Sequence, residues 1–386
     1  MTKSDDKRVP ALRFKGFTDD WEQRKPGDFL VESKIIGHKG DKAKKLTVKL
    51  WGKGVQEKQD ILSGSANTQY YIRKSGQLMY GKLDFLHAAF GIVPSQLNNY
   101  ESTIDSPSFD VKSANSIFLL NLFLRKKFYL YYGERANGSR KAKRIHEKDF
   151  LVMPIKMPEI NEQNKISNLI EIVNNRITLQ QRKLRQLKLL KNALLKRMFT
   201  AKKSPTLRFR DFSKDWKLHK LQDITDRLDN ARVPVTASKR IAGSTPYYGA
   251  NGIQDYVKGY THDGEFLLVA EDGANNINDY PVICAKGKIW VNNHAHVLQA
   301  KNKKIDILFL MYALKFLNMK KYLVGGSRSK LNAETMMKLA LKLPELDEEH
   351  NIGVLIKNMD VLITQYKYRI QKINKFKQFL LQNMFI

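Results

Sequence analysis

Two stretches of the chain carry apolar residues at helical spacing. In the first, which starts near Asn161, apolar residues recur every three, four or seven positions from Ile166 to Met198. In the second, which starts near Asp347, the same spacing runs from Ile352 to Met384. A proline just ahead and acidic residues in the first turn are typical of helix starts. The pattern predicts two helices of about 38 residues, each roughly 57 Å long.

The apolar stripe on each predicted helix is narrow, and a long helix with a narrow stripe needs a partner helix. Because the two helices occupy matching places in the chain, we expect them to pair with each other. The alternative is that each stripe folds back onto its own globular region. An antiparallel pair would relate the two halves of the chain by a pseudo-two-fold, as expected of a tandem duplication.

A short leading segment also occurs twice. Pro10–Trp21 reads PALRFKGFTDDW, and Pro205–Trp216, 195 residues later, reads PTLRFRDFSKDW. The period is too long for a solenoid, so the chain is predicted to contain two copies of one module: leading segment, globular region and long helix. The expected boundaries are 1–24 for the first leading segment, 25–150 for the first globular region, 151–204 for the first helix, 205–216 for the repeated leading segment, 217–335 for the second globular region and 336–386 for the second helix.

The globular regions show the short alternating runs of β-strands. Asn67–Lys82 predicts two strands around Ser75-Gly76, and Gln254–Val269 predicts two strands around the turn signal Asp263-Gly264. Gly76 and Gly264 are 188 residues apart, an offset that also relates Asn137–Arg140 to Gly325–Arg328. We therefore expect an α+β fold in which two similar α/β domains share a skeleton and differ in most residues on it.

The charge of the chain is strongly positive, with 68 Lys and Arg against 38 Asp and Glu, a net charge of +30. Such an excess usually has a polyanionic partner, and nucleic acid is the leading candidate. A membrane surface and a merely solvated basic face are the alternatives. No apolar run approaches a membrane span, and the first residues lack the apolar core of a signal peptide. The single cysteine, Cys284, favours a reducing cytoplasm.

Sequence signatures of catalysis are absent. The three Gly-Lys pairs lack the Ser or Thr of a phosphate-binding loop, and no Gly-x-Ser-x-Gly elbow occurs. No two prolines are adjacent, which excludes the catalytic loop of amino-methyltransferases. His294 and His296 would face the same side of a strand, but no acid stands at a telling spacing, so a structural role or a DNA contact is favoured over a metal. We predict neither catalytic residues nor a metal site.

Residues suited to DNA contact are more numerous. A Gly-Ser-Arg triplet followed by lysines precedes each predicted long helix, and such a backbone can approach phosphates or direct Arg at guanine. Asparagine amides can pair with adenine in the major groove. Plain turns and a surface loop with a solvated Arg are the alternatives. The candidate DNA-binding residues are Tyr70, Lys82, Gly138, Ser139, Arg140, Lys141, Lys143, Tyr247, Tyr248, Asn251, Asn275, Asn276, Asn292, Asn293, His294, Ser327, Arg328 and Lys330.

Taken together, the leading segments, globular regions and helices resemble the specificity (S) subunit of type I restriction-modification enzymes. The leading segments and the stretch Gly326–Leu331 carry the most specific similarity, and Pro246–Ile253, Gly264–Gly273 and Trp290–His296 are also typical. The resemblance extends from about Pro10 to Ile386, although the first globular region matches only in its skeleton.

The resemblance implies that 25–150 and 217–335 are target recognition domains, each reading one half of a bipartite, asymmetric site in double-stranded DNA. It also implies that the helices set the gap, that two methylation subunits bind this chain, and that restriction subunits join them. S-adenosylmethionine, ATP and magnesium would be bound by those partners and no cofactor by this non-catalytic chain. A DNA-binding regulator or recombination protein, and a nuclease or methyltransferase in its own right, are the alternative classes.

Overall fold

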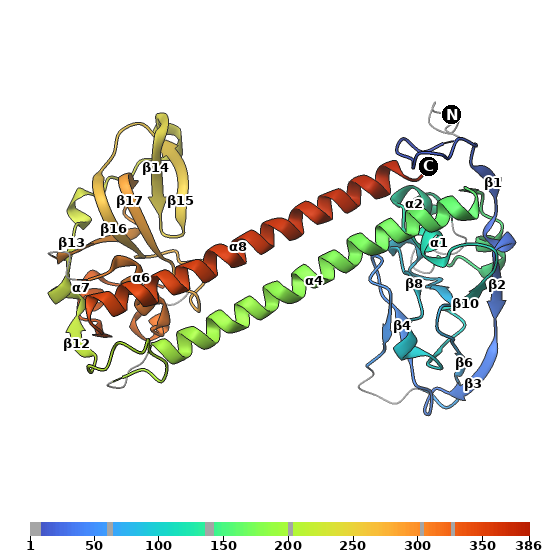
Figure 1. Cartoon of the computed structure of the whole chain (residues 1–386), viewed down its shortest axis with the longest axis horizontal. Coiled ribbons are helices and arrows are strands. Elements are labelled where there is room, and N and C mark those ends of the chain that lie inside the picture. Colours follow the sequence, from blue (N-terminus) through green and yellow to red (C-terminus); the bar gives the residue numbers. More distant parts are fainter. Residues whose placement is uncertain (1–8, 60–64, 136–142, 200–203, 302–304, 326–328) are drawn as a thin grey trace. The chain divides into compact units, whose positions relative to one another are not determined.

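The chain forms two compact units, which are described here from a computed structural model (Figure 1). The structure describes residues 9–59, 65–135, 143–199, 204–301, 305–325 and 329–386. Unit 1 contains residues 1–179 together with 370–386, and unit 2 contains residues 180–369. Each unit therefore holds part of both long helices. The predicted domain boundaries divide the chain into consecutive segments, whereas unit 1 combines two separate segments, so these boundaries stay a prediction.

Both long helices are present where the apolar spacing predicts them. Helix α4 spans Ile160–Met198 and helix α8 spans Leu346–Asn383. Acidic residues occupy the first turn of each, where they stabilise the exposed N–H groups. Within the described residues, no helix combines the length and the apolar character needed to cross a membrane.

The helices pair in antiparallel fashion, as predicted. In unit 1, Leu380 and Met384 at the end of α8 join the same core as Ile166 and Ile170 near the start of α4. In unit 2, Leu194 near the end of α4 packs with the core that holds the start of α8. The alternative also holds in part, because the start of each helix belongs to the globular core of its own module.

Unit 1 is built from small antiparallel sheets. The first leading segment runs into β1 (Glu22–Arg24), which pairs with β11 (Ile155–Met157) immediately before α4. A four-stranded sheet has the order β2 (Leu30–Ser33), β10 (Ser108–Val111), β7 (Leu78–Tyr80) and β8 (Phe90–Ile92). A three-stranded sheet has the order β3 (Ile35–Lys39), β6 (Gln69–Ile72) and β9 (Glu101–Ser102), and β4 (Leu46–Val48) pairs with β5 (Val55–Glu57).

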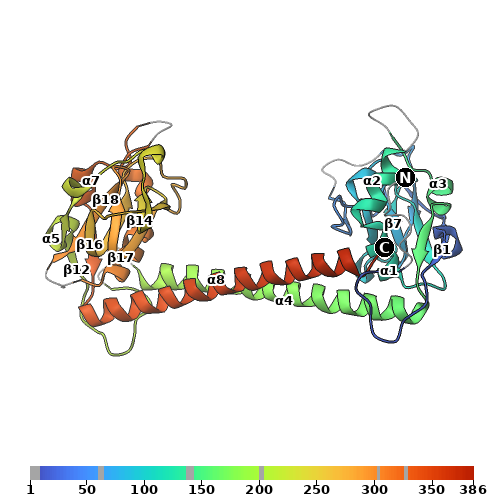
Figure 2. The same ribbon diagram turned by 90° about the horizontal axis from the view of Figure 1, so that it is seen from above.

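An aromatic cluster forms the core of unit 1. Helices α1 (Ser116–Phe123), α2 (Lys126–Glu134) and α3 (Glu147–Leu151) gather around β7 (Figure 2). The ring of Tyr80 lies 4.7 Å from that of Phe150 and 5.7 Å from that of Phe85, measured between centroids. Burial of rings of this size supplies much of the apolar stabilisation of a domain. The hydroxyl of Tyr80 donates a hydrogen bond to the carbonyl oxygen of Ile145 at 2.9 Å, so no polar atom of this ring is left unpaired.

Unit 2 repeats this strand pairing but has a different sheet. The second leading segment runs into β12 (Lys217–Lys220), which pairs with β19 (Ala340–Leu343) immediately before α8. One six-stranded sheet has the order β13 (Thr225–Arg227), β18 (Ala295–Ala300), β16 (His262–Ala270), β17 (Val282–Val291), β14 (Ala242–Gly249) and β15 (Gly252–Val257). Helix α6 (Ile307–Phe316) packs on β16 and β17, and α5 (Leu221–Ile224) and α7 (Ala333–Met337) are short.

The structure confirms two strands around Ser75-Gly76 and corrects the second predicted turn. Ser75-Gly76 forms a turn between β6 and β7, which belong to different sheets. The buried guanidinium of Arg73 bridges those sheets by donating hydrogen bonds to the hydroxyl oxygens of Ser102 and Ser108, one from each sheet. Asp263-Gly264 is not a turn, because both residues lie inside β16 opposite Lys288 and Gly287. The predicted equivalence of Gly76 and Gly264 is therefore wrong.

Each leading segment is held by a buried ion pair to the long helix of its own module. The guanidinium of Arg13 donates two hydrogen bonds, of 2.7 and 2.8 Å, to the carboxylate of Glu162 in the first turn of α4. Arg208 binds Glu348 in the first turn of α8 in the same way, at 2.9 and 2.6 Å. Both glutamate side chains are fully buried. Two parallel hydrogen bonds from a guanidinium offset much of the free-energy cost of burying a carboxylate.

Each leading segment also contacts the end of the other module's helix. The backbone N–H of Leu12 donates to the carbonyl oxygen of Asn383 at 2.8 Å, and that of Leu207 donates to the carbonyl oxygen of Arg197 at 3.1 Å. Beyond these bonds, Phe385 stacks on Phe118, and Trp21 lies edge-on to both rings. The repeat is therefore reciprocal, since each unit is completed by the helix end of the other module.

The same exchange occurs in unit 2 with corresponding rings. Phe199 stacks on Phe309 at 5.2 Å, and Trp216 lies edge-on to Phe309 at 5.8 Å. Phe118 and Phe309 stand at equivalent places in α1 and α6, each on the helix that follows the sheets of its unit. Trp21 and Trp216, which close the two leading segments, thus make matching edge-on contacts with Phe118 and Phe309, although the sheets around them differ.

A polar contact at the start of each long helix repeats with an amide in one unit and a titratable carboxyl group in the other. The backbone N–H of Asn115 donates to the amide oxygen of Gln163 at 3.0 Å, whereas that of Asp306 donates to a carboxyl oxygen of Glu349 at 2.8 Å. Burial raises the pKa of Glu349 to about 8, with a further contribution from the carboxylate of Asp306. The chain therefore contains a neutral and an acidic version of one contact.

Removing the arginine of a leading segment is expected to destabilise its unit. The variant Arg208→Ala leaves the buried carboxylate of Glu348 unpaired and should lower the free energy of unfolding by about 3 kcal/mol. Lys214→Ala is the matched control, because Lys214 pairs with Glu345 on the exposed surface of the same unit and should cost no more than about 1 kcal/mol. Equal losses for the two variants in chemical denaturation would contradict the role given to the buried pair.

Glu349 should give the stability of unit 2 a distinct pH dependence. The folded chain keeps a proton on this carboxyl that the unfolded chain releases near its ordinary pKa of 4.5. The resulting stabilisation is complete below that pH and is lost as the pH rises through about 8. The variant Glu349→Gln should remove this decline from unfolding midpoints measured between about pH 5 and 9. As a control, Asp347→Asn at an exposed position should leave this decline in place. If the unfolding midpoint of Glu349→Gln fell with pH as steeply as that of the unaltered chain, Glu349 would not be the group responsible.

Candidate nucleic-acid interface

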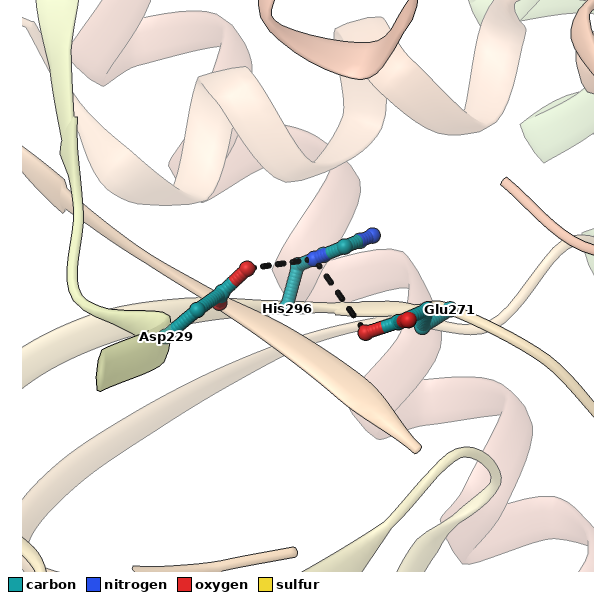
Figure 3. A group of neighbouring side chains, drawn as sticks. All are labelled: Asp229, Glu271 and His296. Carbon is teal, nitrogen blue, oxygen red and sulfur yellow. Dashed lines mark hydrogen bonds and ion pairs between the residues drawn. The ribbon is translucent and has the colours of Figure 1, made fainter. Parts of the chain in front are cut away.

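A charged cluster lies at one end of the six-stranded sheet. Asp229 follows β13, Glu271 follows β16, and His296 lies in β18, so neighbouring strands bring the three side chains together. Figure 3 shows both carboxylates facing the same nitrogen of the His296 ring. The Nδ1 atom lies 2.7 Å from a carboxylate oxygen of Asp229 and 3.6 Å from one of Glu271.

Hydrogen bonds fix the ring of His296 on both sides. Its Nε2 atom lies 2.9 Å from the carbonyl oxygen of Leu331, which can only accept, while Nδ1 faces carboxylates. A ring that carries a proton on each nitrogen satisfies both contacts. Burial opposes ionisation of Asp229, but hydrogen bonds from His296 and from the backbone N–H of Val297 outweigh it and hold the Asp229 pKa below its ordinary value.

Two cations complete the cluster. Arg232 donates a 2.7 Å hydrogen bond to Glu271, and the ammonium of Lys330 lies 2.8 Å from the other oxygen of the same carboxylate. Burial opposes ionisation of Glu271, but these bonds from Lys330 and Arg232 lower its pKa. Donor atoms of Asp229, Glu271 and His296 lie within 4.8 Å of one another, as in a metal site. Because Arg232, Lys330 and the imidazole already bind these carboxylates, we interpret the cluster as an ionic network.

The network anchors the chain on both sides of a predicted DNA-facing triplet. Val324 and Lys330 exchange two backbone hydrogen bonds, of 2.9 and 2.8 Å, and the N–H of Leu331 donates to the carbonyl oxygen of Glu271 at 2.7 Å. Among the sequence-predicted residues, Lys330 is therefore part of the network. Ser327 and Arg328 lie outside the described residues, as do Gly138, Ser139, Arg140 and Lys141 of the first triplet. Lys143 is described, and its ammonium donates to the carbonyl oxygen of Glu134 at 2.7 Å.

The predicted asparagines hold neighbouring loops together. The amide of Asn251 donates to the carbonyl oxygen of Gly273 and accepts from the N–H of Asn275, both at 2.9 Å. Asn276 accepts from two backbone N–H groups that follow it, and the buried Asn292 accepts from the N–H of His294. Asn293 is exposed. The side-chain oxygens of Asn251, Asn276 and Asn292 therefore hold neighbouring backbone N–H groups within the chain.

The two predicted histidines do not share one side of a strand. His296 is buried within β18, whereas His294 precedes that strand, is partly exposed, and lies 2.5 Å from a carboxylate oxygen of Asp272. Sequence spacing gave no sign of the network, because Asp229 and His296 are 67 positions apart. Only the pairing of β13, β16 and β18 brings its members together.

Several other predicted contacts lie inside the domains. Tyr70, Tyr247 and Tyr248 are buried, and Lys82 is buried with its ammonium 2.7 Å from the carboxylate of Glu147. The hydroxyl of Tyr247 accepts from the N–H of Val235 and donates to its carbonyl oxygen. In this structure these four side chains pack and brace the domains. They offer little surface to DNA.

Loss of the Glu271 charge is expected to destabilise unit 2 in a pH-dependent way. The variant Glu271→Gln removes a charged acceptor from Arg232 and should lower the free energy of unfolding by about 2 kcal/mol at neutral pH. Because the folded pKa of Glu271 is lowered, its contribution is present above pH 4.5 and is lost as the pH falls through the folded pKa. The deficit should therefore shrink in acid. Glu265→Gln, which removes an exposed partner of Lys286, is the control and should cost little stability. A loss of unfolding free energy in Glu271→Gln that did not change with pH would argue against the ionic network.

Comparisons with known proteins agree with this architecture. Residues 213–375 match the type I restriction modification DNA specificity domain. A putative type I restriction enzyme specificity subunit of Haemophilus influenzae is 41% identical over 151 residues, which are 39% of this chain and 38% of that protein. The putative MjaX specificity subunit of Methanocaldococcus jannaschii is 21% identical over 339 residues, 83% of this chain and 76% of that protein.

The fold is also that of a solved structure. The S subunit of a type I restriction-modification system from M. genitalium has a TM-score of 0.65 and 14% identity, with 98% of this chain and 99% of that chain covered. At this identity the likeness concerns the fold alone. Residues 213–375 thus match a DNA specificity domain of type I restriction modification systems, and the chain as a whole has the fold of a solved S subunit.

Proposed function

We propose that this chain reads the target sequence of a type I restriction-modification complex, with one globular region for each half of a bipartite, asymmetric DNA site. The match of residues 213–375 to a DNA specificity domain carries the proposal. The net charge of +30 is consistent with binding to the phosphate backbone. The match to the Haemophilus influenzae relative covers only 38% of that protein, so the function of the whole chain is part of the proposal.

The difference between the two globular regions supports two separate readers. The leading segment, the buried Arg-Glu pair and the start of the long helix repeat in both units. The sheets do not repeat, since unit 1 has sheets of four, three and two strands where unit 2 has one six-stranded sheet. A common frame with unlike surfaces suits two different half-sites.

The helices offer surface for protein partners. Several of their apolar side chains remain largely exposed in the structure, among them Ile172, Leu179, Leu189, Leu190, Phe376 and Phe379. Exposed apolar patches of this kind are typical of protein–protein contacts. We assign them to two methylation subunits, one for each copy of the repeated leading segment and helix, with restriction subunits added in the full complex.

Catalysis is assigned to those partners. S-adenosylmethionine would be bound by the methylation subunits, and ATP and Mg²⁺ by subunits of the full complex, while this chain selects the DNA. The alternative of a DNA-binding regulator or recombination protein has no support in the comparisons.

Exchange of one globular region tests the proposal. The chain is co-expressed with its methylation subunits, and methylated adenines are mapped by sequencing. Replacing residues 25–150 with the matching region of another specificity subunit should change one half of the methylated site and leave the other half unchanged. The reciprocal replacement of 217–335 is the control and should change the other half only. A continuous, palindromic or absent methylation motif in the unaltered complex would overturn the two-reader account.

A further inference from the structure

A tryptophan lies exposed at the tip of the β4–β5 hairpin in unit 1. The indole of Trp51 is 59% exposed, whereas Trp21 and Trp216 of the leading segments are 3% and 4% exposed. Trp51 lies outside the repeated leading segments and long helices, so the contacts that bury Trp21 and Trp216 do not explain its presence. Tryptophan is enriched among the residues that contribute most to binding energy at interfaces, because its ring buries a large area.

The backbone holds this ring in a fixed place. Trp51 has a φ of 61°, a conformation that bulky residues rarely adopt and that persists only where surrounding contacts enforce it. Those contacts are hydrogen bonds from the N–H of Trp51 to the carbonyl oxygen of His87 at 2.7 Å and from the N–H of Gly52 to that of Ala88 at 2.9 Å. The ring of His87 lies edge-on to the indole at 5.4 Å. The indole is thus presented by a braced turn.

The same turn packs on the corner between α1 and α2. Gly52 has a φ of 64°, which favours glycine, and a β-carbon there would lie 2.9 Å from a methyl group of Leu124, so the turn lies directly against this side chain. Leu124 is followed directly by the basic run Arg125-Lys126-Lys127. Lys126 and Lys127 of this run are exposed, so the corner on which the turn packs adds positive charge from a second element.

The hairpin itself is also basic. Residues 39–58 contain seven lysines against two acids, Asp41 and Glu57. Lys49 and Lys53 stand two positions before and after Trp51 in the sequence, and both side chains are exposed. Lysine is depleted at protein–protein interfaces, whereas an aromatic ring set among lysines suits bases and phosphates. The surroundings of Trp51 thus favour DNA over a protein partner.

We propose that the Lys49–Gly54 turn contacts DNA, with the indole of Trp51 packed against bases and with Lys49 and Lys53 on flanking phosphates. The inference rests on the proposed function and adds a contacting element for the half-site of unit 1. Apolar and aromatic side chains can insert at base steps, and each phosphate held by a lysine releases counterions.

Two variants of the full complex test the assignment by different readouts. Trp51→Ala should weaken binding to the methylated target duplex by roughly 5- to 100-fold, the range for loss of one base–aromatic contact, with an unchanged salt dependence. Lys53→Ala should lower the slope of log affinity against log salt by about one. Val152→Ala, at another strongly exposed apolar position of unit 1, is the matched control and should change neither. Unaltered melting temperatures would show that all three variants fold.

Tryptophan emission supplies an independent measurement. Addition of target DNA to the unaltered complex should change emission, and much of that change should be absent in Trp51→Phe at saturating DNA. Unaltered affinity of Trp51→Ala together with an unaltered emission change would overturn the inference and leave the proposed function standing. Loss of subunit assembly in Trp51→Ala would overturn it in favour of a protein-facing turn. An unaltered complex that binds no DNA would overturn the proposed function itself.

Discussion

The buried pair between the arginine of a leading segment and the first-turn glutamate of a long helix is the contact on which the rest of the structure depends. It fixes the leading segment across the start of the helix, and only then can the tryptophan that closes the segment meet the rings of α1 or α6. A carboxylate with no exposed surface is costly without a partner, so the pair specifies a single docking of the segment. The same pair occurs in both units, whereas the sheets around it differ.

The two copies are not identical even in this frame. The indole nitrogen of Trp21 donates to Glu162 at 3.3 Å, whereas that of Trp216 is buried without a hydrogen-bond partner among the described residues. The contact to Asn115 uses a neutral amide, and the contact to Asp306 uses a carboxyl whose pKa burial raises. Unit 2 thus bears small electrostatic costs that unit 1 avoids.

The spacing of apolar and acidic residues along the chain predicted the two long helices, whose formation depends on residues close in sequence. The bounds of α4 and α8 agree with apolar spacing and with acids at their starts, because helix formation is governed by neighbours three and four residues away. The repeat of the leading segments also predicted a shared frame. The predicted turn at Asp263-Gly264 failed because pairing with β17 overrides a local turn signal. The break between β15 and β16 falls instead at residues 258–261, where Gly259 has a φ of 85°.

The candidate site was less accessible to sequence reasoning. Burial of Tyr70 and Tyr247 depends on which face of their strands meets the core, and buried Lys82 pairs with Glu147, which is far from it in the sequence. The ionic network around His296 joins residues from separate strands and a loop, so no spacing marks it. Exposure of Trp51 follows from its position at a hairpin tip, which only the pairing of β4 and β5 defines.

The reciprocal helix ends impose an order on biosynthesis. Unit 2 is a continuous segment, residues 180–369, so every residue it needs has been translated before the ribosome reaches the end of α8. Unit 1 is discontinuous. The N–H of Leu12 bonds to Asn383 and the ring of Phe118 stacks on Phe385, so neither contact can form until the end of the chain has been translated. Domains generally fold as units while the chain emerges. Here the half that is made first is completed last, and the nascent first half must persist with its aromatic surface uncovered until the last turns of α8 have been made.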